Sequence, residues 1–326
     1  MTRRRVAVRR LASAIVTLGL VSFALFLVAR ITPGDPLAGT DEVAARGASA
    51  DTKRELRALY GLDRPVLPAY GSWLAAALRG DLGRSFHDRR PVVDKIAERL
   101  PLTVLLNTLV IALTLAVAVP LGTWAALHPR SPADRWTAAA TYSLYAVPVF
   151  WAALMLQLLF AARLDWLPLM GVRSDSLAGA PVWKRAVDVL AHLVLPVLSL
   201  SYGSIAYVSR FVRATLLEGA LPDAARAARA RGLGRTEVLV RHGFRQAAIP
   251  LLTLAGFLVP ALVSGSVLVE RVFAIPGLGG LLYDAVLQRD LPVVLGVTLL
   301  TGVATVAGVA LADTLYAVLD PRVRRG

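Results

Sequence analysis

The chain has 326 residues, of which 56% are hydrophobic and 18% are charged, and its mean hydropathy is +0.60. This composition excludes an ordinary soluble domain, which carries more charge. The absence of Cys excludes disulfides, thiolate metal sites and thiol catalysis, while the net charge of +14 fits nucleic acid, anionic lipid or orientation in a membrane.

Six apolar stretches are long enough to cross a bilayer, because a span needs roughly 20 apolar residues. They are residues 11–31, 102–127, 136–162, 190–211, 247–269 and 291–319. The spans that contain Pro120, Pro148, Pro196 and Pro260 are expected to be kinked, as bundled membrane helices tolerate. The sequence therefore predicts an all-α polytopic membrane protein.

The basic residues are distributed unevenly between the two sides of this six-span arrangement. Five Arg precede the first span, and residues 212–246 carry seven Arg against three acidic residues. Residues 128–135 and 320–326 are also positive, whereas the alternate connections are nearly neutral. The positive-inside rule then predicts that both termini are cytoplasmic. No small-x-small pattern follows Ala29, so we expect an uncleaved first span.

The connection at residues 32–101 is expected to form a helical insert on the outer side. Thr52 and Glu55 match a capping box at the start of one helix, and residues 68–79 read as a second apolar helix. A third helix is expected after Pro91, with four apolar residues on one face, Val92, Val93, Ile96 and Leu100. The insert is too poor in apolar residues to predict a separate domain.

The connection at residues 212–246 is expected to hold two short helices. Pro222 can begin the first and Gly232 can end it, and Thr236 can cap the second. A DNA-reading helix is disfavoured because both ends are tied to spans. An amphipathic helix on anionic lipid would carry Trp, Phe or Leu where this one carries Ala. The small side chains favour a helix that docks closely on a cytoplasmic partner.

The sequence contains no H-E-x-x-H, no Gly-rich phosphate loop with Lys and no G-x-S-x-G. We therefore predict neither an enzyme nor a metal site. Asp313 is a carboxylate deep in an apolar run, where an ion is costly; it is either functional or a structural hydrogen bond between helices. His192 is expected in a capped or interfacial role, and Arg210 and Arg213 are expected to snorkel toward water.

The cytoplasmic connection carries Arg226-Ala227-Ala228 and, after three residues, Gly232. This pattern resembles the EAA motif of ABC-importer permeases, in a longer form typical of the dipeptide, oligopeptide and nickel branch. Two positions depart from it: Arg226 replaces the acidic residue, and Ala224 replaces the usual Tyr. Companion motifs are TPGDP (32–36), YGLDRP (60–65), GDLGRS (80–85), WLPLMG (166–171), SGSVLVERVFAIPGLGGLL (264–282), RDLPVV (289–294) and DTLYAVLDPRVR (313–324).

The resemblance implies a type I ABC-importer permease fold with six transmembrane helices, in the inner or plasma membrane of a bacterium. The implied partners are a second similar permease, two cytoplasmic ATPases and an external solute-binding protein, with no nucleic acid. The ATPases would use ATP, and this chain would bind no cofactor. The residues implied to contact an ATPase are Asp223, Arg226, Ala227, Ala228, Arg229, Gly232, Leu233 and His242.

The substrate implied by the resemblance is a short peptide, with nickel, glutathione or another small solute left open. A stand-alone secondary transporter or channel is the alternative from another class. Several polar side chains could face the translocation pathway, although packing between helices explains each equally well: Ser201, Tyr202, Ser204, Tyr207, Ser264 and Ser266. The segment AIPGLGG (274–280) is either a tight turn or a part of an outer gate.

Overall fold

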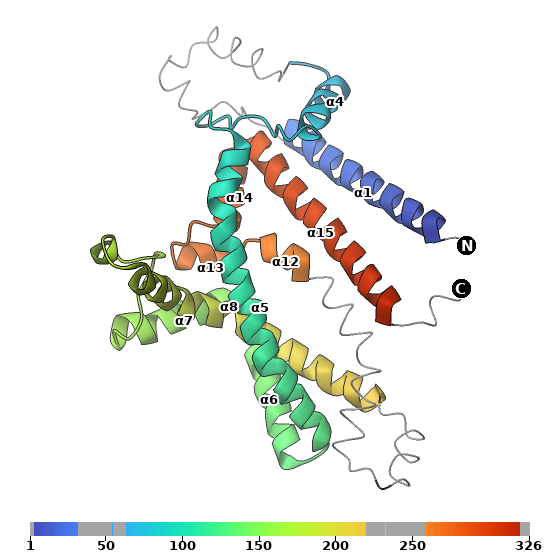
Figure 1. The fold of residues 1–326 in the computed structure, drawn as a ribbon. Helices are drawn as coiled ribbons and strands as arrows, with labels where there is room; N and C mark the ends of the chain where they lie inside the picture. The colour runs from blue at the N-terminus through green and yellow to red at the C-terminus, as the bar shows by residue number, and fades with distance from the viewer. Residues whose placement is uncertain (1–2, 32–53, 55–62, 220–231, 233–257, 320–326) are drawn as a thin grey trace. The chain divides into compact units, whose positions relative to one another are not determined.

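A computed structural model of the chain describes residues 3–31, 54, 63–219, 232 and 258–319 (Figure 1). Within these ranges the structure is helical, and its β structure is limited to an isolated bridge between Arg84 and Pro91. The α-helices are α1 (Arg3–Ile31), α4 (Val66–Ala77), α5 (Val92–Leu127), α6 (Pro132–Ala146), α7 (Val149–Leu156), α8 (Val182–Gly219), α12 (Leu258–Val263), α13 (Val267–Val272), α14 (Leu278–Leu287) and α15 (Leu291–Leu319). A π-helix, η1 (Gln157–Arg163), continues α7, and η2 (Asp175–Leu177) is a 3₁₀ turn.

Three of the described helices, α5, α8 and α15, are long and apolar enough to cross a membrane. The segments Pro132–Ala146 and Val149–Arg163 pass the same test together, with a bend of 96° between them. Pro148 explains the bend, because it lacks an N–H and drives Val147 into an extended conformation. The expected kink at this proline is thus a complete break. Residues 247–257 of the fifth expected span lie outside the described residues.

The chain divides into two units, of which the first comprises residues 1–103, 263–267 and 276–307. Its core joins the start of α5 to α14 and the start of α15, through Val92, Ile96, Leu278, Leu281, Ala285, Val293 and Val297. Helix α1 lies beside α15 (Figure 1), where a Cβ added at Gly302 would come within 2.7 Å of the Leu18 side chain. Figure 1 also shows α4 at the end of α1 that is remote from the N-terminus.

Helix α5 differs from the expectation in two ways. The predicted third helix of the insert and the second span form one continuous helix, in which Pro101 causes no interruption. Val93 is not on the buried face that we predicted, because 42% of its surface is exposed whereas Val92 and Ile96 are buried. Successive residues of an α-helix are about 100° apart, which separates Val93 from Val92. The predicted capping box at residues 52–55 lies outside the described part, and the predicted second helix is α4.

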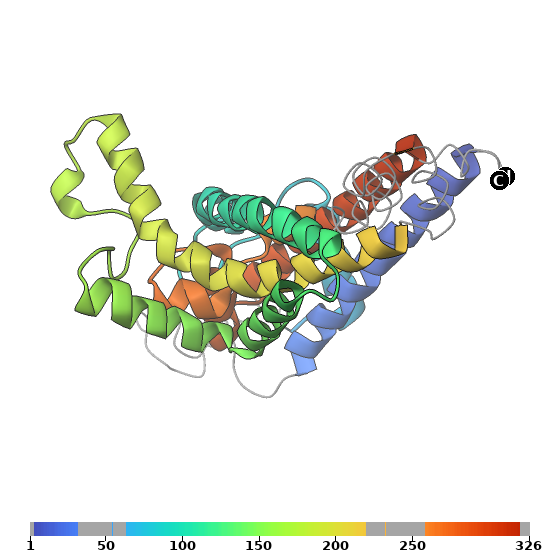
Figure 2. The same ribbon diagram turned by 90° about the horizontal axis from the view of Figure 1, so that it is seen from below.

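The second unit comprises residues 104–262, 268–275 and 308–326. Helices α6 and α7 both pack on α8, and Figure 2 shows them following it on either side of their break. The Tyr202 hydroxyl on α8 donates to the Val147 carbonyl at that break. The Gln157 side-chain amide donates to the carbonyls of Leu169, 2.7 Å away, and Val272, 3.2 Å away. These bonds attach the motif WLPLMG to the segment that contains Val272.

The structure explains why one position of the segment AIPGLGG, Gly279, is a glycine. It lies in the first turn of α14, where the Leu278 N–H donates to the Thr103 hydroxyl at 2.9 Å. A Cβ at Gly279 would lie 2.8 Å from the carbonyl carbon of Gly265 and 2.9 Å from the Val267 nitrogen. Glycine is therefore required here by a close approach of two backbone segments, in addition to any turn.

We expect Gly279→Ala to lower the thermal stability of the protein, because the obstructing atoms are backbone and cannot rotate away. Overpacking of this kind costs about 1–3 kcal/mol. Gly71→Ala is a matched control in helix α4, where an added Cβ meets nothing within 4 Å. It should leave stability unchanged or raise it, by up to about 1 kcal/mol. Thermal unfolding of the detergent-purified protein measures both, and equal midpoints for the two variants would contradict the close approach.

Candidate functional site

Of the eight residues predicted to contact an ATPase, the structure describes Gly232. The other seven lie outside the described residues: Asp223, Arg226, Ala227, Ala228, Arg229, Leu233 and His242. Gly232 is exposed, and its φ of +81° lies in the left-handed region. A Cβ there would meet no atom within 4 Å, so the backbone conformation and not crowding requires glycine. Glycine often takes this conformation directly after a helix.

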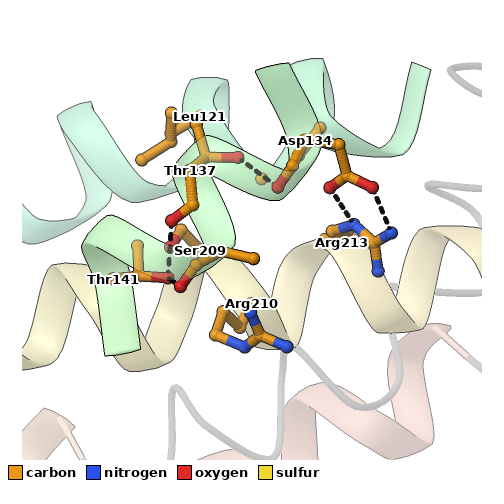
Figure 3. A pocket seen from close by; sticks show the side chains of 10 residues that line it. Leu121, Asp134, Thr137, Thr141, Ser209, Arg210 and Arg213 are labelled. Carbon is orange, nitrogen blue, oxygen red and sulfur yellow. Dashed lines mark hydrogen bonds and ion pairs between the residues drawn. The ribbon is translucent and has the colours of Figure 1, made fainter. Parts of the chain in front are cut away.

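The end of helix α8, directly before the predicted coupling segment, is held by a two-pronged ion pair (Figure 3). Arg213 donates from Nε to Oδ1 of Asp134 and from Nη2 to Oδ2, both at 2.7 Å. Asp134 is only 5% exposed and also accepts the Arg130 N–H at 2.9 Å. Parallel hydrogen bonds between guanidinium and carboxylate fix both orientation and distance. The pair therefore fastens the start of α6 to α8.

Local sequence explains why Asp134 stands at this point. Ser131 caps α6 and accepts the Asp134 N–H at 3.0 Å, and Pro132 occupies the first helical turn. A carboxylate in the first turn of a helix is also stabilised by the helix dipole. Arg213, which we expected to snorkel toward water, is bound by this acid and keeps 27% of its side chain exposed. The Arg210 guanidinium lies 3.9 Å from the centre of the Tyr142 ring, which is itself exposed.

A close contact between α5 and α8 lies beside the ion pair. A Cβ at Gly122 would fall 2.4 Å from the Ser209 carbonyl oxygen and 2.8 Å from the Val212 Cβ. The buried residues Ala126, Val212 and Leu216 extend this contact toward the end of α8. The cavity between the three helices measures about 20 Å³, which admits about one water molecule. The three helices are therefore closely packed beside the ion pair.

A second polar cluster joins two of the family motifs, GDLGRS and RDLPVV. The Asp290 carboxylate is buried and accepts the Ser85 hydroxyl and the Phe86 N–H, the latter at 2.9 Å. Lys95 donates to Asp88 at 2.8 Å. Burial by itself would raise the pKa of Asp88, but hydrogen bonds from Lys95, the Arg90 N–H and Ser85 outweigh it, so this pKa is lowered. Lys95 thus pairs with Asp88, whereas Asp290 accepts hydrogen bonds from neutral donors, and the cluster links two segments that are far apart in the sequence.

The residues considered for a translocation pathway lie in both units. On α8, the buried Ser201 hydroxyl donates to the Val197 carbonyl of its own helix at 2.6 Å, and Tyr202 binds Val147. Ser204 and Tyr207 are exposed on the same helix. Ser264, which is exposed, and Ser266, which is half-buried, belong to the first unit. On α8, Ser201 and Tyr202 thus bind backbone carbonyls of the protein, whereas Ser204 and Tyr207 are exposed.

The other two candidates are His192 and Asp313. The buried His192 ring places Nδ1 2.8 Å from the Asp188 carbonyl and 3.5 Å from its carboxylate, and that carboxylate accepts two hydrogen bonds from Ser174. Asp313 lies on α15, with its side chain outside the described part. Among the described residues no group of three or more His, Asp or Glu could hold a metal ion.

Sequence reasoning missed Asp134 and Gln157. The pattern Ser131-x-x-Asp134 before an apolar run is a recognisable helix start, but we counted this aspartate only in the charge balance. Gln157 could have been singled out only as an uncharged polar residue in an apolar run, where a side-chain hydrogen bond is expected. Its partners, Leu169 and Val272, are set by tertiary structure.

We expect Asp134→Asn to destabilise the protein, because it leaves the Arg213 guanidinium partly buried without its counter-charge. A loss of this kind costs about 1–3 kcal/mol. Asp175→Asn removes an exposed carboxylate in the same unit and should have little effect. In an Arg213→Gln background, Asp134→Asn should cost much less than in the parent. Thermal unfolding of the four proteins in this double-mutant cycle tests the pair, and additive losses would refute it.

Comparison with known families covers nearly the whole chain. The pattern of the family described as "Binding-protein-dependent transport system inner membrane component" matches residues 118–325. Its companion, described as the N-terminal part of the same membrane components, matches residues 3–107. All the motifs quoted above lie within these two matches.

Individual relatives agree with this assignment. The chain is 38% identical over 316 residues to a Brucella abortus protein provisionally named a peptide transport system permease, covering 97% of this chain and 98% of the relative. It is 34% identical to the oligopeptide transport system permease AppB of Bacillus subtilis and 32% identical to the dipeptide transport system permease DppB of Escherichia coli, with 97% of each chain covered in both comparisons. The chain therefore belongs to the family of binding-protein-dependent transport system inner membrane components, the ABC-importer permeases that its motifs resemble.

Proposed function

We propose that this chain forms half of the translocation pathway of an ATP-driven importer for short peptides, delivered by an external binding protein. The similarity to peptide permeases over 97% of the chain is the observation that carries this proposal. The similarity includes the insert at residues 32–101 as well as the membrane helices. A likeness confined to the helices would support only a general permease.

The complete transporter in this proposal contains a second similar permease and two cytoplasmic ATPases. The ATPases hydrolyse ATP, and this chain binds no nucleotide. It has six spans with both termini in the cytoplasm, and residues 32–101 lie outside. Residues 212–246 dock on an ATPase, with Asp223, Arg226, Ala227, Ala228, Arg229, Gly232, Leu233 and His242 at or near the contact. Closure of the ATPases then displaces this segment and moves the attached helices.

The ion pair at the end of α8 gives this displacement a route. Arg213 lies six residues before Gly219, the last residue of α8, or about 9 Å along the helix axis. A displacement of the docking segment moves the end of α8, where Leu216 packs with Ala126 of α5 and Arg213 pairs with Asp134. The bond to Asp134 then displaces α6, and the close contact at Gly122 displaces α5. The three helix ends then move as one body.

The same machinery could carry nickel, glutathione or another small solute, since binding proteins largely select the solute in such systems. Uptake by the complete transporter in proteoliposomes, with labelled dipeptides and with Ni²⁺ as alternative substrates, separates these possibilities. The peptide proposal expects ATP-dependent uptake of the dipeptide only. Uptake by this chain alone, without ATPases, would instead identify a secondary transporter.

We expect Gly232→Val to abolish uptake, because a β-branched residue is strongly disfavoured at a φ of +81°. Gly232→Asn is the matched control: Asn tolerates this conformation, and nothing crowds the site, so it should retain most uptake. Equal activity of the two variants would contradict a role for the turn.

Ala228→Trp should abolish uptake and weaken ATPase association if residues 222–246 dock in a packed groove. Full uptake by Ala228→Trp would favour the lipid-surface alternative.

The proposed topology is tested by reporter fusions at sites in each connection. Fusions at Ala44, Asp175 and Asp284 should report the outer side, and fusions at Ser131, Gly234 and Gly326 should report the cytoplasm. The reason is the concentration of Arg in the second set of connections. One fusion that reports the opposite side would require a different number of spans.

A further inference from the structure

One cavity of the first unit is lined by several cationic side chains. It measures about 400 Å³ and lies between the end of α1, helix α4 and the start of α15. Four arginines line it, Arg30, Arg64, Arg84 and Arg89. Among the described residues of its lining none is acidic. Its size and charge suit a small anionic group.

Trp73 supplies a second observation that points to a ligand. Its indole Nε1 is buried at the cavity and has no hydrogen-bond partner among the described residues. A buried donor without an acceptor costs about 1–3 kcal/mol. A ligand oxygen in the cavity would remove this cost.

Arg64 and Arg84 form no ion pair with a described residue. Asp63 interacts electrostatically with Arg30. Asp290, at the start of α15, accepts the Ser85 hydroxyl and the Phe86 N–H. The Arg84 guanidinium donates to the Arg89 carbonyl at 3.0 Å, which is a neutral acceptor. Charge-assisted bonds from arginine are strongest with phosphate or carboxylate oxygens.

The surroundings of the cavity are apolar, and this selects the class of ligand. Helix α4 has no charged residue, and Tyr70 attaches it to the apolar part of α1 through Ser22 and Gly19. Leu67 on α4 is 70% exposed, and Ile31 at the end of α1 is 67% exposed. A free phosphate or an acidic peptide would not cover this apolar surface. A phospholipid needs a cationic site for its headgroup and an adjoining apolar surface for its chains.

We propose that this cavity binds the phosphate headgroup of an anionic phospholipid, whose acyl chains lie along α1 and α4. Arg64 and Arg84 contact the phosphate, and the Trp73 indole donates to one of its oxygens. Tryptophan and arginine beside the end of an apolar helix are the residues expected at headgroup level. The inference concerns lipid binding and is independent of which solute the protein transports.

The test uses the complete transporter, purified with its partners, delipidated in detergent and titrated with phosphatidylglycerol or phosphatidylcholine under native mass spectrometry. Phosphatidylglycerol should bind more tightly than phosphatidylcholine. Arg64→Gln combined with Arg84→Gln should weaken phosphatidylglycerol binding by at least about tenfold, since each change removes a charge-assisted contact. The matched control combines Arg79→Gln with Arg173→Gln, which removes two exposed arginines that do not line the cavity.

Trp73→Phe separates ligand binding from a structural role. It keeps a ring in place and removes the N–H, so it should weaken phosphatidylglycerol binding by about threefold to tenfold, the value of one hydrogen bond. The delipidated variant should be as stable as the parent or more stable, because a buried unpaired donor has gone. Trp183→Phe, at a Trp that is 65% exposed and does not line the cavity, is the control.

Three outcomes would overturn the proposal. The first is equal binding of the two lipids together with no effect of the cavity variants. The second is thermal stabilisation by sodium phosphate that equals stabilisation by phosphatidylglycerol, which would assign the cavity to a free anion. The third is loss of binding-protein affinity in the arginine variants with phosphatidylglycerol binding unchanged, which would assign it to an acidic protein surface.

Discussion

Backbone groups inside a membrane must find partners within the protein, because hydrocarbon offers none. This constraint explains where the chain places its few uncharged polar side chains. Four such side chains in the described part meet a backbone group of another segment near a helix end: Tyr202 meets the Val147 carbonyl, Gln157 meets those of Leu169 and Val272, Asn107 meets that of Leu262, and Thr103 meets the Leu278 N–H. The break at Pro148 is possible because Tyr202 reaches it. The polar residues of this protein are thus largely committed to its backbone, which narrows the set that can face a solute.

Ionic contacts follow a different rule. Asp134 and Arg213 lie at helix ends. Asp134 is buried, but 27% of the Arg213 side chain stays exposed, so the desolvation of the pair is incomplete while its geometry remains bidentate. The pair adds orientation where three helices converge and where the chain is about to leave α8. The buried Asp290 carboxylate is instead stabilised by hydrogen bonds from neutral donors. Both arrangements join segments that are far apart in sequence, at points where the helices themselves supply no such link.

Sequence patterns predicted what depends on nearby residues. Apolar length predicted the long helices α5, α8 and α15, and Pro148 predicted a kink at the point where the structure has a break. The left-handed conformation predicted for Gly232 is observed. Contacts across long separations were not predictable in this way. Asp134 and Arg213 are 79 residues apart, and glycine at position 279 is explained only by backbone at residues 265–267. Arg213 illustrates the difference: charge and position near a span suggested solvent, and a carboxylate brought in by tertiary structure determined its actual contact.

The hydrogen bonds that connect α8 to α6 and to the α6–α7 break differ in strength. The ion pair supplies two charge-assisted hydrogen bonds, each worth about 1.5–3 kcal/mol, and Gly122 places α5 in backbone contact with α8. The Tyr202 hydroxyl, which meets the chain at the α6–α7 break, is a neutral donor worth about 0.5–1.5 kcal/mol, and α7 also packs on α8. In the coupling proposed above, a displacement that enters at the end of α8 would move the start of α6 with it, because the ion pair is the stronger polar link. Between α6 and α7, Val147 and Pro148 provide no continuous helix, so the angle between these two helices would be the easier one to change.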